Sequence, residues 1–212
     1  MGDCYKKGVV VVKKLIGLSI FCLFPALSFG NFTVSGNTIQ PACVGLFDQQ
    51  RTPYPVVVGV DISRCQGSSN ISHMAKSDGS RIYFLYQNAS RSVGDGYYGY
   101  QVIGQTTNGI YVLHSFSQLP GDNKIFDALL FIKLEDQYLN IYIQSNKAVS
   151  EKTTKMLLVG YMPGGDRCSG GIKSANIEGN RLTVDQYPAI NSVDQCQGAT
   201  RVAIDMAAIP AE

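Results

Sequence analysis

The stretch YYGYQVIGQTTNGIYVLHSFS, residues 97–117, decides the fold that we expect for this chain. Two runs rich in β-branched and aromatic residues, 100–106 and 110–116, flank the dipeptide Asn108-Gly109. Asn-Gly tolerates the positive φ angles of a type I′ turn, so this pattern predicts a tight β-hairpin. The hairpin sets the expectation of an antiparallel β protein for the rest of the chain.

Short runs of similar composition lie on both sides of this hairpin. In residues 138–144 apolar and polar side chains alternate with the period of two that a half-buried strand shows. Residues 31–55, 66–80 and 149–154 are polar, and we expect an irregular lead-in, a loop and a connection there. The expected strands are residues 56–62, 81–87, 125–134, 138–144, 155–162, 172–177, 181–187 and 200–206.

About nine short strands, joined by tight turns and without a convincing helix, predict a single all-β domain over residues 31–212. Glu135-Asp136 is expected to separate two of the strands, and Pro163-Gly164-Gly165 to end another. Sequential hairpins favour antiparallel pairing, either as a meander barrel or as a two-sheet sandwich. The pattern leaves both architectures open.

Residues 1–30 have the order of a secretory signal peptide. Lysines at positions 6, 7, 13 and 14 precede the uncharged apolar run 15–29, and Ser28 and Gly30 supply small residues for cleavage near Gly30. The run is shorter than the roughly 20 residues that a spanning helix needs, although a retained anchor stays an alternative. We therefore expect a periplasmic or secreted protein that meets a membrane only transiently, during export.

The charge of the chain excludes one class of partner. It has 18 basic and 16 acidic residues, and removal of residues 1–30 takes away four lysines and Asp3, which leaves 14 basic against 15 acidic side chains. The remainder has no basic run that could follow a phosphate backbone. We expect no nucleic-acid partner.

Four cysteines follow the signal peptide: Cys43, Cys65, Cys168 and Cys196. An even number in an exported chain predicts disulfides, and we favour the pairs Cys43–Cys65 and Cys168–Cys196 because each is close in sequence. Free buried thiols are the alternative. The spacing is not CxxC and the chain has only two histidines, His73 and His114, so we expect no metal and no cofactor.

No catalytic motif is complete. Residues 165–171, GDRCSGG, resemble the Gly-Asp-Ser-Gly-Gly loop of trypsin-like serine proteases, but Arg167 and Cys168 interrupt the motif. Ser169 with His114 could form a hydrolytic pair only if the fold brought them together. Paired carboxylates offer a second route, from the acids on or beside expected strands: Asp127, Glu135, Asp136 and Asp185. We expect a glycine-rich turn at 165–171 and no catalytic residues.

The tyrosines are the best candidates for a binding surface. One cluster follows Gly94-Asp95-Gly96, and we expect residues 94–100 to form a recognition loop; other tyrosines lie on the polar face of the 138–144 strand. Tyrosine offers contact area and a hydroxyl at low entropic cost, although β proteins contain many tyrosines for packing alone. The candidate partner-binding residues are Tyr97, Tyr98, Tyr100, Tyr138 and Tyr142.

These observations predict an exported, non-enzymatic binding protein of the cell envelope with a protein partner. It would neutralise a lytic enzyme or serve envelope or secretion assembly. The alternatives are an envelope-polymer hydrolase and a β-barrel carrier of a small apolar ligand. The sequence leaves open the partner, the oligomeric state and the origin of the chain, and with the origin the use of the glycosylation motifs at Asn31, Asn70 and Asn88.

Overall fold

The computed structural model describes most of the chain after the expected signal peptide. The described residues are 32–47, 58–67, 75–78, 81–86, 96–119, 121–122, 124–142, 148–189 and 198–209. The expected signal peptide and its cleavage site lie outside these ranges, as do His73, Cys196 and the asparagines of the three glycosylation motifs.

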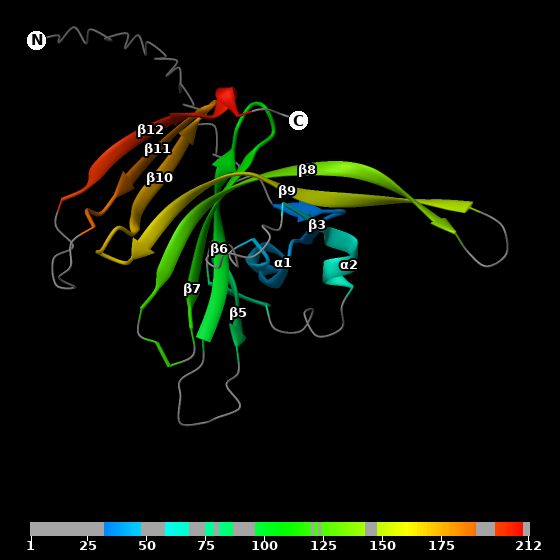
Figure 1. The fold of residues 1–212 in the computed structure, drawn as a ribbon, viewed down its shortest axis with the longest axis horizontal. Coiled ribbons are helices and arrows are strands. Elements are labelled where there is room, and N and C mark those ends of the chain that lie inside the picture. Colours follow the sequence, from blue (N-terminus) through cyan, green and yellow to red (C-terminus); the bar gives the residue numbers. More distant parts are fainter. Residues whose placement is uncertain are drawn as a thin grey trace, which may run out of the picture.

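A seven-stranded antiparallel sheet forms the middle of the molecule (Figure 1). From β4 to β9 each strand pairs with its neighbour in the chain, which is the meander that sequential hairpins predict. In spatial order the strands are β3 (Gly59–Asp61), β9 (Ala148–Asp166), β8 (Phe126–Tyr142), β7 (Tyr111–Gln118), β6 (Gly96–Gln105), β5 (Arg81–Tyr86) and β4 (Ala75–Asp78).

Both faces of this sheet are partly covered. A second antiparallel sheet of β10 (Ile172–Glu178), β11 (Arg181–Gln186) and β12 (Thr200–Asp205), followed by the 3₁₀ turn η2 (Met206–Ala208), packs on one face. The other face carries the short hairpin of β1 (Thr33–Val34) and β2 (Asn37–Thr38) with the helices α1 (Pro41–Gly45) and α2 (Ile62–Gln66). The all-β antiparallel prediction is confirmed, as two packed sheets with a small helical layer behind the larger sheet.

The central strands of the large sheet are buried on both faces. On β8, Leu129 and Phe131 pack into the core under the second sheet, while Leu130 and Ile132 pack into the core under the helices. Strands covered on both sides read as continuous apolar runs. This explains why residues 128–132 show no alternation although they lie in an antiparallel sheet.

The hairpin at Asn108-Gly109 is present, but its turn is not type I′. The amide of Gly109 donates to the carbonyl of Thr106, and the amide of Thr106 donates to the carbonyl of Ile110. Only Gly109 in this turn has a positive φ, at 86°. This is a type I turn followed by a left-handed glycine. The side-chain amide of Asn108 donates to the carbonyl of Met206 in η2, directly after the second sheet.

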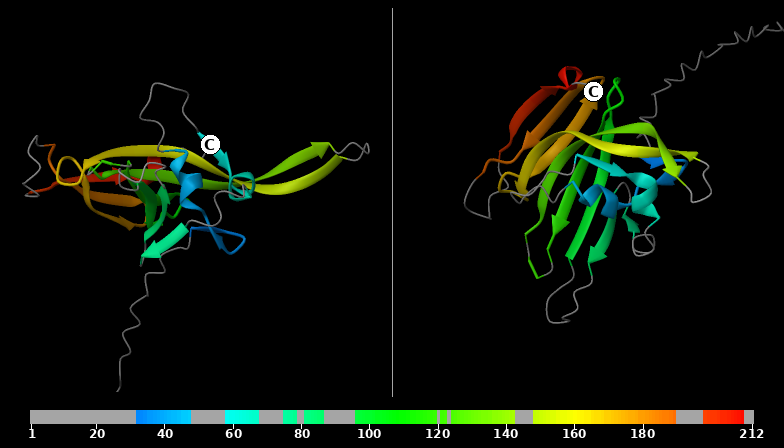
Figure 2. Two further views of the ribbon diagram at one scale, coloured as in Figure 1. Left: turned by 90° about the horizontal axis from the view of Figure 1, so that it is seen from below. Right: turned by 45° about the vertical axis from the view of Figure 1, so that its right-hand side comes forward.

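Strands β8 and β9 are longer than expected. Their pairing runs from Phe126 opposite Asp166 to Tyr142 opposite Ala148, with register shifts between residues 126 and 128 and between residues 131 and 132. Glu135-Asp136 and residues 149–154 were therefore wrongly expected to break the strands, and residues 163–165 belong to the end of β9. Beyond β7 and β3 the two strands continue as a two-stranded arm that projects from the sheet (Figures 1 and 2). Successive polar residues at 135–137 and 150–155 are the reason that the sequence suggested breaks there.

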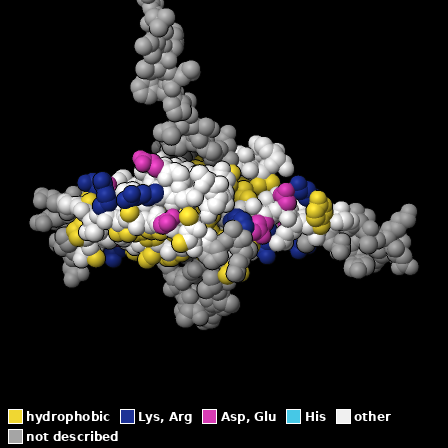
Figure 3. Space-filling view, turned by 90° about the horizontal axis from the view of Figure 1, so that it is seen from above, with side chains coloured by type: hydrophobic (Ala, Val, Ile, Leu, Met, Phe, Trp, Pro, Cys, Tyr) yellow, Lys and Arg dark blue, Asp and Glu magenta, His cyan; other side chains and the backbone are white. Residues whose placement is uncertain are grey.

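An ion pair joins the two strands of the arm. The Nζ of Lys152 on β9 lies 2.7 Å from Oδ2 of Asp136 on β8. Figure 3 shows acidic and basic side chains side by side on the arm. Cross-strand pairs of opposite charge contribute modestly to sheet stability, by roughly 0.2–1 kcal/mol each.

The N-terminal part is more regular than expected. The lead-in 31–55 contains β1, β2 and α1, and the expected loop 66–80 contains β4. The expected strand 56–62 is shortened because Asp61 starts α2, accepting a hydrogen bond from the amide of Arg64 at 3.0 Å. None of the helices in the described part is long and apolar enough to cross a membrane.

A disulfide joins the two short helices. Cys43 on α1 and Cys65 on α2 are bonded, with Cα atoms 5.9 Å apart, which confirms the predicted pair. The bond indicates that the chain resides in an oxidising environment. Cys168 is also disulfide-bonded, but the predicted partner Cys196 lies outside the described residues.

Candidate functional site

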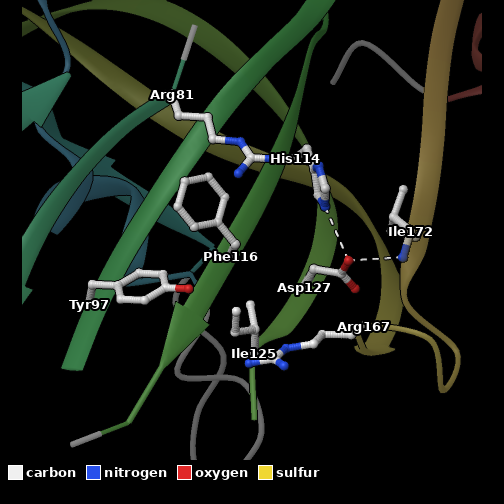
Figure 4. A pocket seen from close by; sticks show the side chains of 8 residues that line it. All are labelled: Arg81, Tyr97, His114, Phe116, Ile125, Asp127, Arg167 and Ile172. Atoms are coloured by element: carbon white, nitrogen blue, oxygen red, sulfur yellow. Dashed lines mark hydrogen bonds and ion pairs between the residues drawn. The ribbon is translucent and has the colours of Figure 1, made fainter. Parts of the chain in front are cut away.

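A cavity of about 460 Å³ lies beside the second sheet, on the face of the large sheet that this second sheet covers in part. Strand β7 explains its position. Ile110 and Val112 are buried beneath the second sheet, whereas His114 and Phe116, further along the same face, line the cavity. The cavity is lined by Arg81, Tyr97, His114, Phe116, Ile125, Asp127, Arg167 and Ile172 (Figure 4).

The strand register brings these residues together. Phe116 stands opposite Asp127 of β8 on one side and opposite Gly99 of β6 on the other. A Cβ on Gly99 would lie 2.6 Å from ring carbons of Phe116 and 2.7 Å from the carbonyl oxygen of Ile82. The missing side chain at position 99 therefore allows the Phe116 ring to lie over β6 and form a wall of the cavity.

Asp127 holds one edge of the cavity in place. Its Oδ1 accepts the amide of Gly165 at 3.1 Å, and its Oδ2 accepts the amide of Ile172 at 2.9 Å. The Nε2 of His114 lies 3.3 Å from the same Oδ2. A carboxylate with this many donors is fixed in position. Asp127 thus fastens the glycine-rich turn after β9 and the start of β10 to the large sheet.

The glycine-rich turn is closely packed, as expected for a structural loop. A Cβ on Gly164 would lie 2.0 Å from Oδ1 of Asp127, and one on Gly171 would lie 1.9 Å from the carbonyl oxygen of Arg167. Ser169 pairs through its backbone with Asp166, whose Oδ1 accepts the amide of Ile125. The turn presents Arg167 to the cavity.

Two arginines and a tyrosine hydroxyl converge on the cavity. Figure 4 shows the guanidinium group of Arg81 above Phe116 and directed toward His114, while the guanidinium group of Arg167 and the hydroxyl of Tyr97 approach Ile125 from opposite sides. The guanidinium carbon of Arg81 lies 5.5 Å from the centroid of the Phe116 ring. Burial raises the pKa of Tyr97, and the charges of Arg167 and Arg81 partly oppose this rise. Both guanidinium groups are therefore close enough to act on the hydroxyl.

The described lining residues supply hydrogen-bond donors and apolar surface. Among the described residues that line the cavity there is no serine, threonine, cysteine or lysine. His114 faces Asp127, and the described part of the chain holds no group of three His, Cys, Asp or Glu side chains placed for a metal ion. The cavity offers cationic and hydroxyl donors next to apolar surface.

The predicted tyrosines do not share a surface. Residues 96–105 form a strand, so the expected recognition loop over 94–100 is wrong from Gly96 onward. Tyr98 and Tyr100 are 2% and 0% exposed in the core under the helices, where the Tyr100 hydroxyl donates to the carbonyl of Ile39. Their side chains cannot reach a partner because they are buried in this core.

The other tyrosines lie elsewhere. Tyr97 points the opposite way from its neighbours and is the tyrosine that lines the cavity. Tyr138 is 71% exposed on the β8–β9 arm, and Tyr142 lies in β8 with its side chain outside the described residues. Of the five candidates, only Tyr97 is placed at the cavity.

Most of the candidate carboxylates are held in surface ion pairs. The guanidinium of Arg201 donates to both oxygens of Asp185, at 2.7 and 2.9 Å, and this pairing lowers the pKa of Asp185 to about 2. Asp136 pairs with Lys152, and Glu135 with Lys133. Asp127 is the candidate acid that lines the cavity, so the structure places no two of these acids there as a pair.

The pairing of His114 with Asp127 was not predicted, because it depends on the register of β7 against β8.

Comparison of the chain with protein-family models, with curated proteins and with solved structures finds no match.

Proposed function

We propose that this chain is an exported, non-enzymatic binding protein whose cavity receives a group from a protein partner. The observation that carries this proposal is the convergence of Tyr97, Arg81 and Arg167 on one cavity with apolar walls. Tyrosine and arginine are the residue types that most often dominate binding energy at protein interfaces. A cavity that holds both, beside apolar surface, suits an anchoring side chain or chain end.

Export is supported by two independent features. Residues 1–30 have the composition of a signal peptide, and the Cys43–Cys65 disulfide requires an oxidising compartment. On this proposal the intact mass of protein recovered from the envelope or the medium corresponds to loss of about 30 N-terminal residues.

The absence of a catalytic role is supported by the state of Asp127 and His114. The carboxylate of Asp127 accepts hydrogen bonds from two backbone amides and so holds the glycine-rich turn in place, which gives this residue a structural role. A general base needs a nucleophile or a water that it can orient, and the described lining residues include no serine, threonine, cysteine or lysine for His114 to activate.

A hydrolase of envelope polymers is the second candidate, because His114 and Asp127 lie 3.3 Å apart at the cavity. It predicts polymer cleavage by the purified protein and loss of that cleavage in His114→Gln. The carrier of a small apolar ligand has less support, since two arginines line the cavity.

Site-specific photocrosslinking tests the binding proposal. Tyr97 is replaced by the photoreactive p-benzoylphenylalanine in the exported protein, and the producing cells are irradiated. A matched control carries the same residue at Val202, a partly exposed position on β12. We expect a discrete protein adduct from position 97 that position 202 does not give. Equal adducts from both positions, or none from position 97, contradict the proposal.

A further inference from the structure

We propose that the anchoring group is a carboxylate attached to an apolar or aromatic group. The carboxylate lies between Arg81, Arg167 and the hydroxyl of Tyr97, and the apolar group contacts Phe116, Ile125 and Ile172. This inference rests on the proposed function and assigns a ligand chemistry to the same cavity. The free carboxylate at the end of a polypeptide with an apolar last residue has this chemistry, and so does a small aromatic acid.

The charged groups of the lining favour an anion. The lining contains two guanidinium groups and one carboxylate, with His114 as a further polar group. Asp127 directs its two oxygens to the amides of Gly165 and Ile172 and to His114. Arg81 forms no ion pair with any side chain that the structure describes. The cavity therefore attracts an anion.

The number of charges on the anion distinguishes a carboxylate from a phosphate. Among the lining side chains that the structure describes, two arginines against one aspartate leave a balance of one positive charge. A carboxylate brings one negative charge and matches this balance, whereas a phosphate monoester brings about 1.5 to 2 at neutral pH. The excess charge of a phosphate would be repelled by Asp127. Arginine also presents a planar fork that fits the two oxygens of a carboxylate.

The walls and the volume of the cavity favour a small ligand that is partly apolar. Phe116 and the two isoleucines form apolar walls next to the cationic groups, so a ligand with both characters buries both at once. A volume of about 460 Å³ falls within the range of roughly 300–1,000 Å³ for small-ligand sites. The ring of Phe116 also supports the guanidinium of Arg81 from one side, which fixes the cation before a ligand arrives.

Binding of defined probes to the full-length, oxidised, exported protein tests this inference. The probes are acetyl-Gly-Gly-Phe with a free carboxylate, the same peptide as its C-terminal amide, 3-phenylpropionate and phenyl phosphate. Affinities are measured by calorimetry or by chemical-shift titration. We expect the free acid to bind at least about tenfold more tightly than the amide, because charge-assisted bonds are lost in the amide.

Substitutions of the lining residues test whether the acid binds in this cavity. We expect Arg81→Gln and Arg167→Gln each to weaken acid binding about tenfold, and Tyr97→Phe to weaken it less, since it removes one neutral donor. Arg64→Gln, an exposed arginine on α2 at the opposite face of the sheet, should leave the affinity unchanged. Thermal unfolding of each variant checks that the fold is intact.

The outcomes separate this inference from the proposed function. Equal affinity for acid and amide, tighter binding of phenyl phosphate, or an equal loss in Arg64→Gln overturns the carboxylate assignment, and the photocrosslink at position 97 then still stands for the binding proposal. Failure of all four probes together with failure of the crosslink overturns both. Equal binding of 3-phenylpropionate and the peptide acid supports the assignment and identifies a free acid as a sufficient ligand.

Discussion

The backbone amide of Ile172 donates a hydrogen bond of 2.9 Å to Oδ2 of Asp127, and this bond joins the two sheets at the edge of the cavity. Ile172 is the first residue of β10, and Asp127 lies near the start of β8. At the other end of the sheets, Asn180 accepts from the amide and hydroxyl of Thr107 at 2.9 and 2.7 Å. The angle and spacing of the sheets are thus fixed by polar contacts at both ends, with the apolar core between them.

Replacement of Asp127 by asparagine tests the first of these contacts. An amide group has one acceptor oxygen, so Asp127→Asn directs an NH₂ group at the amide of Gly165 or of Ile172. We expect a loss of about 1–3 kcal/mol in the free energy of unfolding, measured with urea. Glu178→Gln, at the exposed end of β10, is the control and should change stability by less than about 0.5 kcal/mol. Equal effects of the two variants would show that the contact is unimportant.

Two glycines on the same strand give a matched test of how the cavity wall is built. A Cβ at Gly99 meets both the Phe116 ring and a backbone carbonyl at under 3 Å, whereas a Cβ at Gly104 meets only Ile177, at 3.7 Å. We expect Gly99→Ala to destabilise the protein by about 1–3 kcal/mol through overpacking. It should also displace Phe116, which is visible in its ring-proton chemical shifts.

Gly104→Ala is the matched control. It should be neutral or slightly stabilising, because alanine restricts the unfolded chain more than glycine does. If both alanine variants behave alike, the close approach of Phe116 to β6 does not explain the glycine at position 99.

The fold was predictable wherever a strand is buried or a turn has a distinctive sequence. Residues 128–132 read as a strand because both of their faces enter a core, and Asn108-Gly109 located a hairpin although its turn type was wrong. Prediction was partly wrong on the β8–β9 arm. Residues 138–142 were expected as a strand and form one, but Glu135-Asp136 and residues 149–154 were expected as breaks, because polar side chains occupy successive positions there, as in a loop.

The candidate site was only partly predictable, because it depends on register. Tyr98 and Tyr100 share one strand face and Tyr97 the other, so strand periodicity alone excluded a common surface for the three. Which face is buried depends on the helices that cover it, and the sequence does not reveal that. Likewise Asp127 and His114 meet only because β7 and β8 pair with Phe116 opposite Asp127.

Removal of the disulfide between the two helices tests its contribution to stability. The Cys43–Cys65 bond closes a loop with a sequence separation of 22. The chain-entropy model predicts that Cys43→Ala/Cys65→Ala lowers the free energy of unfolding by about 3 kcal/mol. The measurement is guanidinium unfolding of the double variant beside the oxidised protein. A thiol reductant should lower the stability of the unmodified protein by more than that of the double variant, which keeps the bond at Cys168. Equal losses in the two proteins would contradict a stabilising role of the Cys43–Cys65 bond.

The Asp185–Arg201 pair predicts how stability depends on acidity. The guanidinium of Arg201, with the hydroxyl of Ser174, lowers the pKa of Asp185 from 3.8 to about 2. Because the folded pKa lies below the unfolded one, the pair stabilises the fold fully above about pH 4, and this contribution disappears as the pH falls through about 2.

In Arg201→Gln the contribution should be missing at every pH. The difference in stability between wild type and Arg201→Gln is therefore largest near neutral pH and shrinks toward pH 2, in urea unfolding at low salt. Arg181→Gln, on the neighbouring strand, removes a charge without removing this pair and should show a constant difference over the same range. A constant difference in Arg201→Gln as well would mean that Asp185 titrates alike in the folded and unfolded chain.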